Sequence, residues 1–150
     1  MKTLGIAHIA FGVRDMDKSL VFYRDLLGFK VVRDEEQQAE GTVLPALYRH
    51  IHKKRRVTTL YWEVGEGESF LVLSEQKDGK VTGAPIKLDE IGIHHVSFWV
   101  KDLNQLYGEL KARGVPFLVT PTEVVTPDGT FYTSFLSDPD GILIQLDQLL

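Results

Sequence analysis

The sequence predicts an α+β fold built from two βαβββ units. The first observation is an ungapped internal repeat, in which residues 8–16 match residues 95–103, with histidine on histidine and aspartate on aspartate. The second is that each copy continues with one helical pattern and several short strand-like segments. We therefore expect a single domain with units at 1–75 and 92–150, joined by a linker at 76–91.

The first unit opens with a strand over residues 5–13, which are rich in β-branched and aromatic residues. Asp15 follows at an N-cap position, where a short carboxylate accepts hydrogen bonds from free amides of a first helical turn. The apolar face of this helix has the 3.6-residue period. Gly28 comes directly after the last apolar residue, where a left-handed residue ends a helix.

Three further strands complete the first unit, at residues 29–33, 57–64 and 69–74. Gly-Glu-Gly-Glu at 65–68 suits a hairpin turn, because glycine tolerates positive φ. We expect the polar residues 34–41 to form a mobile loop. Residues 42–52 fit a short helix or a loop equally well.

The second unit repeats this order. Asp102 takes the N-cap position of its helix, and Gly114 takes the position at the end. Strands are expected at residues 116–120, 130–137 and 142–147. Asp-Pro-Asp-Gly at 138–141 is predicted to turn between the last two, with proline fixing φ.

Composition excludes several function classes. The chain has no cysteine, which rules out thiolate metal sites, iron–sulfur clusters and cysteine nucleophiles. Its net charge of −4 argues against nucleic-acid binding. The basic run at 49–56 is either a solvated helix end or loop, or an anion-attracting rim beside a pocket.

Nothing in the sequence predicts a membrane partner. No signal peptide is visible at the N-terminus. No apolar run approaches the roughly 20 residues that a membrane-spanning helix needs. We therefore expect a cytoplasmic protein.

Three motifs carry a family resemblance: the repeated strand start around His8 and His95, the Phe-Tyr…Leu-Gly-Phe pattern at 22–29, and Asp-Pro-Asp-Gly…Gln-Leu at 138–146. They resemble the vicinal-oxygen-chelate superfamily, which includes glyoxalases, bleomycin resistance proteins and extradiol dioxygenases. The resemblance implies that the sheets form a curved mixed sheet or open-barrel cup. It also implies a divalent metal, a small-molecule substrate and a homodimer.

Carried over by position, the resemblance implies metal ligands at His8, His95 and Gln145. The last of these is usually a glutamate, so its neutral amide oxygen should weaken metal binding by roughly a few kcal/mol. Val72 falls at a position where glyoxalases have another ligand, and valine cannot bind a metal. Two imidazoles and one amide oxygen remain, for iron, manganese, zinc or nickel. The strand pattern by itself also allows the alternative that these residues are polar side chains packed or hydrogen-bonded in the core.

Other candidates follow from strand alternation. Ser97 and Trp99 share a face with His95, whereas His94 is expected on the opposite face. Candidate substrate-binding residues are Val72, Ser74, Ser97, Trp99 and Tyr132. Glu63 and Glu75 are candidate acid/base groups, or else solvated residues at strand ends.

Two functions are open at this stage. The first is a metal-dependent dioxygenase, lyase or isomerase acting on a substrate chelated through vicinal oxygens. The second is a metal-free protein that binds a ligand or antibiotic, as bleomycin resistance proteins do. Val72 and Gln145 stand where related enzymes have metal ligands, as expected for a protein that has lost its metal site. Metal analysis of the purified protein distinguishes the two functions.

Overall fold

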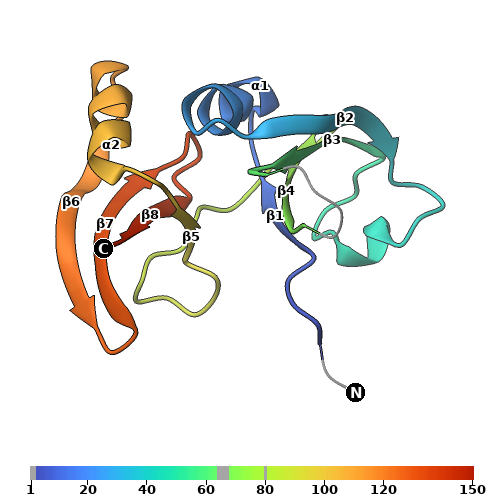
Figure 1. The fold of residues 1–150 in the computed structure, drawn as a ribbon. Coiled ribbons are helices and arrows are strands. Elements are labelled where there is room, and N and C mark those ends of the chain that lie inside the picture. The colour runs from blue at the N-terminus through green and yellow to red at the C-terminus, as the bar shows by residue number, and fades with distance from the viewer. Residues whose placement is uncertain (1–2, 64–67, 80) are drawn as a thin grey trace. The chain divides into compact units, whose positions relative to one another are not determined.

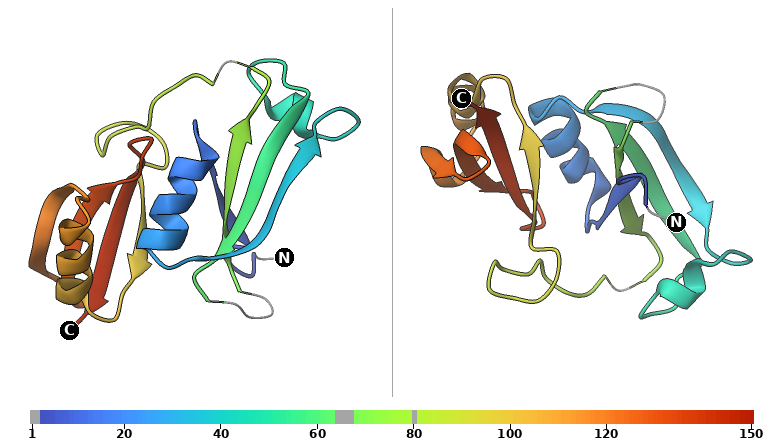
Figure 2. Two further views of the ribbon diagram at one scale, coloured as in Figure 1. Left: turned by 90° about the horizontal axis from the view of Figure 1, so that it is seen from above. Right: turned by 60° about the horizontal axis from the view of Figure 1, so that its bottom comes forward.

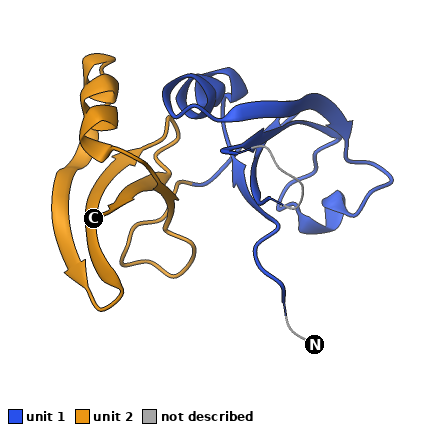
Figure 3. Ribbon diagram, viewed as in Figure 1, with its two compact units in different colours: residues 1–83 blue, residues 84–150 orange. Residues whose placement is uncertain are grey.

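A computed structural model of the protein describes residues 3–63, 68–79 and 81–150. The chain divides into two compact units, residues 1–83 and 84–150 (Figure 3). Each unit is one βαβββ module with its own four-stranded mixed sheet, which confirms the predicted α+β class. Among the described residues, no helix is long and apolar enough to span a bilayer.

Unit 1 has a strand, a helix and three more strands (Figure 1). Its elements are β1 (His8–Gly12), α1 (Met16–Leu20), the π-helical continuation η1 (Val21–Leu26), β2 (Lys30–Gln38), the 3-10 turn η2 (Leu44–Leu47), β3 (Lys54–Tyr61) and β4 (Phe70–Gln76). The strand order is β1-β4-β3-β2, with β1 parallel to β4 and the other pairs antiparallel. The expected hairpin turn at 65–68 lies mostly outside the described residues.

Unit 2 repeats this topology. Its elements are β5 (His95–Trp99), α2 (Leu103–Ala112), β6 (Phe117–Thr126), β7 (Gly129–Ser137) and β8 (Leu143–Leu149), and the strand order is β5-β8-β7-β6. The Asp138 turn forms as predicted, because the Asp138 carboxylate accepts from the amides of Asp140 and Ile142 at 2.9 and 2.8 Å.

Each sheet has a helix-covered face and an open face, as the views in Figure 2 show for each unit by itself. In unit 1, the covered face holds the buried core, with Met16 and Tyr23 of the helix beside Leu60 and Leu71 of the strands. In unit 2, the buried core residues are Leu103, Leu110, Leu136, Ile144 and Leu146. We call the other side of each sheet its open face.

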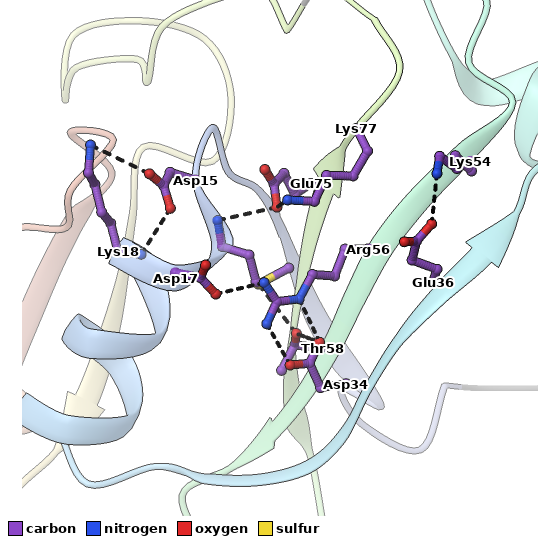
Figure 4. Close-up of polar contacts among 11 residues, drawn as sticks. Asp15, Asp17, Lys18, Asp34, Glu36, Lys54, Arg56, Thr58, Glu75 and Lys77 are labelled. Atoms are coloured by element: carbon purple, nitrogen blue, oxygen red, sulfur yellow. Dashed lines mark hydrogen bonds and ion pairs between the residues drawn. The ribbon is translucent and has the colours of Figure 1, made fainter.

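The loop expected at residues 34–41 is wrong for residues 34–38, because β2 continues to Gln38. Its polar side chains find partners on β3. The Arg56 guanidinium holds Asp34 through two hydrogen bonds of 2.7 and 2.8 Å, and Lys54 pairs with Glu36 at 3.0 Å (Figure 4). The end of the basic run at 49–56 is therefore strand, rather than a helix end or loop. Strand β6 is also longer than predicted, running to Thr126.

Candidate functional site

The open face of unit 1 carries His8. Strand β1 alternates, with Phe11 buried and His8 exposed. The register sets His8 beside Phe70 of β4, and the two rings stack with centroids 5.3 Å apart. Val72 and Ser74 follow at two-residue steps on the same side. The structure therefore brings three predicted site residues of unit 1, His8, Val72 and Ser74, to one face.

Glu75 lies on the other face of the same strand, which contradicts the expectation that it sits near the site. Its side chain is buried, accepts a hydrogen bond from the Met16 amide at 3.4 Å and pairs with Lys77 at 2.9 Å (Figure 4). A carboxylate there satisfies a free amide at the start of α1. Glu63 is exposed just beyond the end of β3.

The open face of unit 2 holds most of the predicted residues of that unit. The register pairs Ser97 with Gln145, and Trp99 with Asp147. His95 shares this face by alternation. Trp99 is 69% exposed, and its ring lies 5.8 Å from that of Phe131.

Tyr132 does not belong to this face. It pairs with Gln148, whose side-chain oxygen accepts a hydrogen bond from the Leu103 amide at the start of α2 at 2.7 Å. Tyr132 is therefore on the helix-covered side, because the neighbouring residue Thr133 pairs with Asp147 on the open face. This position contradicts the expectation that Tyr132 is one of the substrate-binding residues, because its side chain lies on the other face of the sheet from Gln145.

Gln145 is held in one orientation by Asp147. Its amide nitrogen donates to both carboxylate oxygens of Asp147, at 2.9 and 3.0 Å, and to the Thr133 hydroxyl at 3.0 Å. Ser97 donates to the same carboxylate at 2.5 Å. Because an ionised carboxylate only accepts, the nitrogen of Gln145 must face Asp147. Its oxygen is then left to bind a ligand.

Asp147 was not among the predicted site residues. The signal was present in the sequence, since Asp147 lies two residues after Gln145 on a strand and therefore on the same face. Thr133 was missed as well, because its place beside Gln145 depends on the pairing of β7 with β8.

His95 is half-buried and contacts a second histidine. Its Nδ1 lies 2.7 Å from Nδ1 of His94, and the two rings stack with centroids 4.7 Å apart, so the expectation that His94 points to the opposite face is wrong. Burial lowers the pKa of His95, and the positive charge of a protonated His94 lowers it further, while Asp147 acts in the opposite sense. The neutral imidazole that a metal ligand requires is thus favoured.

The described residues contain no group of three or more His, Asp or Glu side chains placed to hold a metal ion. A three-ligand site built from these residues would have to include another kind of donor, such as the amide oxygen of a glutamine. The environment of His95 fits the role of a ligand. The Nδ1 contact leaves Nε2 of His95 to bind a metal, and metal-binding histidines commonly use their other ring nitrogen in a hydrogen bond of this kind.

Comparison with known proteins agrees with this fold. A family model described as Glyoxalase/Bleomycin resistance protein/Dioxygenase superfamily matches residues 5–146. A probable lactoylglutathione lyase of Vibrio cholerae is 26% identical over 143 residues, covering 95% of this chain and 89% of that protein. The mitochondrial methylmalonyl-CoA epimerase of Homo sapiens is 23% identical over 141 residues, covering 94% of this chain and 72% of that protein.

Solved structures give the same result for the fold. The glyoxalase family protein from Bacillus cereus superposes with a TM-score of 0.75 at 19% identity, covering 100% of this chain and 97% of that one. The glyoxalase family protein from Enterococcus faecalis gives a TM-score of 0.66 at 20% identity, with coverage of 96% and 97%. With a family model matched over nearly its whole length, the chain belongs to the Glyoxalase/Bleomycin resistance protein/Dioxygenase superfamily.

Proposed function

We propose that the protein is a metal-dependent enzyme with lyase or isomerase chemistry on a small substrate that offers two adjacent oxygens. The proposed ligands are His8, His95 and Gln145. The observation that carries the proposal is the orientation of Gln145, whose amide nitrogen is held by Asp147 while its oxygen is left to bind. Relatives named as a lyase and an epimerase support this reaction class.

A divalent ion, when bound, acts as a Lewis acid that polarises a carbonyl oxygen of the substrate. Iron, manganese, zinc and nickel all suit imidazole ligands. The chain's own contribution is to keep His95 neutral and Gln145 oriented. Asp147 adds a negative charge beside the amide, which increases the negative charge on the Gln145 oxygen and offsets part of what a glutamate would supply.

The proposed substrate-binding residues combine an apolar surface with a hydroxyl in each unit. Val72 gives an apolar surface and Ser74 a hydroxyl on the open face of unit 1, while Ser97 and Trp99 do the same in unit 2. Glu75 and Tyr132 are left out, because they lie on helix-covered faces. An acid/base role for Glu63 stays a prediction, as do a homodimer, a cytoplasmic location and dioxygenase chemistry.

Metal analysis of the purified protein tests the proposal. We expect about one divalent ion per chain after dialysis, and its loss in His8→Ala, His95→Ala and Gln145→Ala. His50→Ala is the matched control, because His50 is an exposed histidine that contacts Thr82 and lies outside the proposed ligand set. Epimerisation of methylmalonyl-CoA and turnover of lactoylglutathione are the first activities to assay. Metal retained at full occupancy in His95→Ala would contradict the proposed ligand set.

A metal-free binding protein is the second candidate. Val72 favours it, because this side chain cannot bind a metal and stands on the open face beside Ala10 of β1. If the wild-type protein holds no metal, even after incubation with each of the four ions, but binds an apolar ligand, this second function replaces the first.

A further inference from the structure

Strand β3 begins with three basic residues in succession, Lys54, Arg55 and Arg56. Two of them bind carboxylates of the described residues, and Arg55 does not. Arg56 binds the carboxylates of Asp34 and Asp17, and Lys54 binds that of Glu36. Arg55, which lies between them, points to the open face. Val57 is two residues further along the strand and pairs with Ser74 on that face, and residues two apart on a strand share a face. Among the described residues, Arg55 forms no ion pair with a carboxylate.

Neutral groups hold the Arg55 side chain in place. Its Nε and Nη2 donate to the side-chain oxygen of Gln37, at 3.2 and 2.9 Å, and its Nη1 donates to the Ser74 hydroxyl at 3.4 Å. Gln37 is itself fixed, because its nitrogen donates to Glu35 at 3.1 Å. Arg55 is half-buried. A half-buried cation that is oriented in advance but not neutralised is suited to bind an anion, and a guanidinium fork matches a carboxylate or phosphate.

Ser74 adds a second donor. Its oxygen accepts from both Arg55 and Gln76, at 3.4 and 3.3 Å. With both lone pairs engaged, its own hydrogen is left to donate. A hydroxyl and a guanidinium side by side on one face are a pair of donors that a single anionic group can use together.

The register gives the distance from this pair to His8. His8 stands level with Phe70, and Ser74 lies four residues further along β4. At about 3.3 Å per residue, the separation is about 13 Å along the strand. Both ends lie on the open face of the same sheet in unit 1.

We infer that Arg55 and Ser74 form an anion subsite, and that the substrate is an elongated molecule with a carboxylate or phosphate group about 13 Å from the end that reacts at His8. The placement of the reacting end at His8 rests on the proposed function. The anion subsite does not, because none of its residues is a proposed metal ligand.

Titration of the metal-stripped protein with inorganic phosphate and with succinate tests the subsite, observed by amide NMR. We expect shifts concentrated at Gln37, Arg55, Ser74 and Gln76, and at least a tenfold loss of affinity in Arg55→Gln. Lys54→Gln is the matched control, since it removes the same charge from the adjacent residue on the other side of the strand. Tighter binding of phosphate than of succinate indicates a phosphate group on the substrate, and the reverse order indicates a carboxylate.

The inference is overturned if Arg55→Gln binds both anions as tightly as the wild type does, if Lys54→Gln loses as much affinity as Arg55→Gln, or if the shifts lie elsewhere. Should Arg55→Gln fail to fold, Arg55→Lys keeps the charge but loses the fork, and we expect a loss of threefold or more in affinity. An unchanged affinity in that variant also counts against the subsite. Because the titration uses metal-free protein, a failed metal analysis and a failed anion titration are separate results.

Discussion

The amide nitrogen of Gln145 lies 2.9 and 3.0 Å from the two carboxylate oxygens of Asp147. This contact decides which end of the amide is available to a ligand. An isolated glutamine turns easily, and its oxygen and nitrogen then exchange places. A carboxylate neighbour removes that freedom, because it repels the oxygen and attracts the nitrogen.

Asp147→Asn is therefore expected to weaken metal binding by about 10- to 100-fold, the range seen when a group that orients a ligand is lost. The shape of the side chain is kept, but the Gln145 amide loses the charge that orients it. Competition with a coloured chelator measures the affinity. Asp128→Asn is the control, since Asp128 is an exposed turn residue away from Gln145. Equal affinity of the wild type and Asp147→Asn would remove the orienting role.

His95 should titrate below the ordinary histidine pKa, because burial and His94 both lower it. In the unfolded chain its pKa returns to about 6.5, so the unfolded state binds more protons and stability falls as the pH drops through and below that value. His94→Gln should raise the pKa of His95 by removing the second cause. NMR titration of the ring Cε1 protons gives both values. A His95 midpoint at or above 6.5 in the wild type would contradict this account.

Much of the fold follows from local signals. Asp15 and Asp102 were predicted as N-caps, and each accepts from the amide three residues later, at 3.1 and 2.9 Å. Gly28 and Gly114 were predicted at the helix ends, and both have φ of +80°. Such signals need only neighbours along the chain, which is why sequence periodicity and spacing capture them.

The misplaced residues depend on partners far away in sequence. From Arg33 onward strand β2 is polar on both sides, so its pairing with β3, and not a hydrophobic pattern, shows that residues 34–38 are strand. Glu75 and Tyr132 could be assigned to a face only from the pairing of their strands. Asp147 is a different case, because its partner Gln145 is only two residues away on the same strand, and this spacing alone places both side chains on one face.

Arg56 joins helix α1 to strand β2 through Asp17 and Asp34, which predicts a clear effect on stability (Figure 4). Arg56→Gln should lower the free energy of unfolding by about 2 kcal/mol, because it removes charge-assisted hydrogen bonds to the partly buried Asp34. Lys54→Gln, which breaks an exposed pair with Glu36, should cost less than about 0.5 kcal/mol. Urea denaturation measures both, and similar losses in the two variants would contradict the distinction.

The contact between Arg56 and Asp34 also predicts that the stability of the fold depends on pH. The hydrogen bond from Arg56 lowers the pKa of Asp34 below its ordinary value of 3.8. The folded state therefore binds fewer protons than the unfolded state in this range. The stabilisation is fully present above about pH 4 to 5 and is lost as the pH falls through the lowered pKa. In Arg56→Gln, denaturation midpoints should change less with acid between pH 5 and pH 2 than in the wild type.

Glu75→Gln should affect folding and leave the proposed metal site intact. The variant loses the ion pair with Lys77 and weakens the acceptor for the Met16 amide, at a cost of about 1 kcal/mol. Because Glu75 lies on the covered face, metal content should equal that of the wild type. Elemental analysis and urea denaturation give the two readouts. Loss of metal without loss of stability would contradict this assignment and indicate that Glu75 takes part in the metal site.

Gly28 and Gly114 offer a test of the internal repeat that avoids the site entirely. Both have φ of +80°, and an added Cβ would meet nothing within 4 Å at either position. Alanine at each should therefore cost about 1 kcal/mol from backbone conformation alone. Gly108 is the opposite case, an exposed position inside α2 with open space around it and without a positive φ, and Gly108→Ala should stabilise by about 0.5–1 kcal/mol. Urea denaturation of the three variants should show two losses of similar size and one gain. A stabilised Gly28→Ala or Gly114→Ala would mean that the helix ends do not need the left-handed conformation.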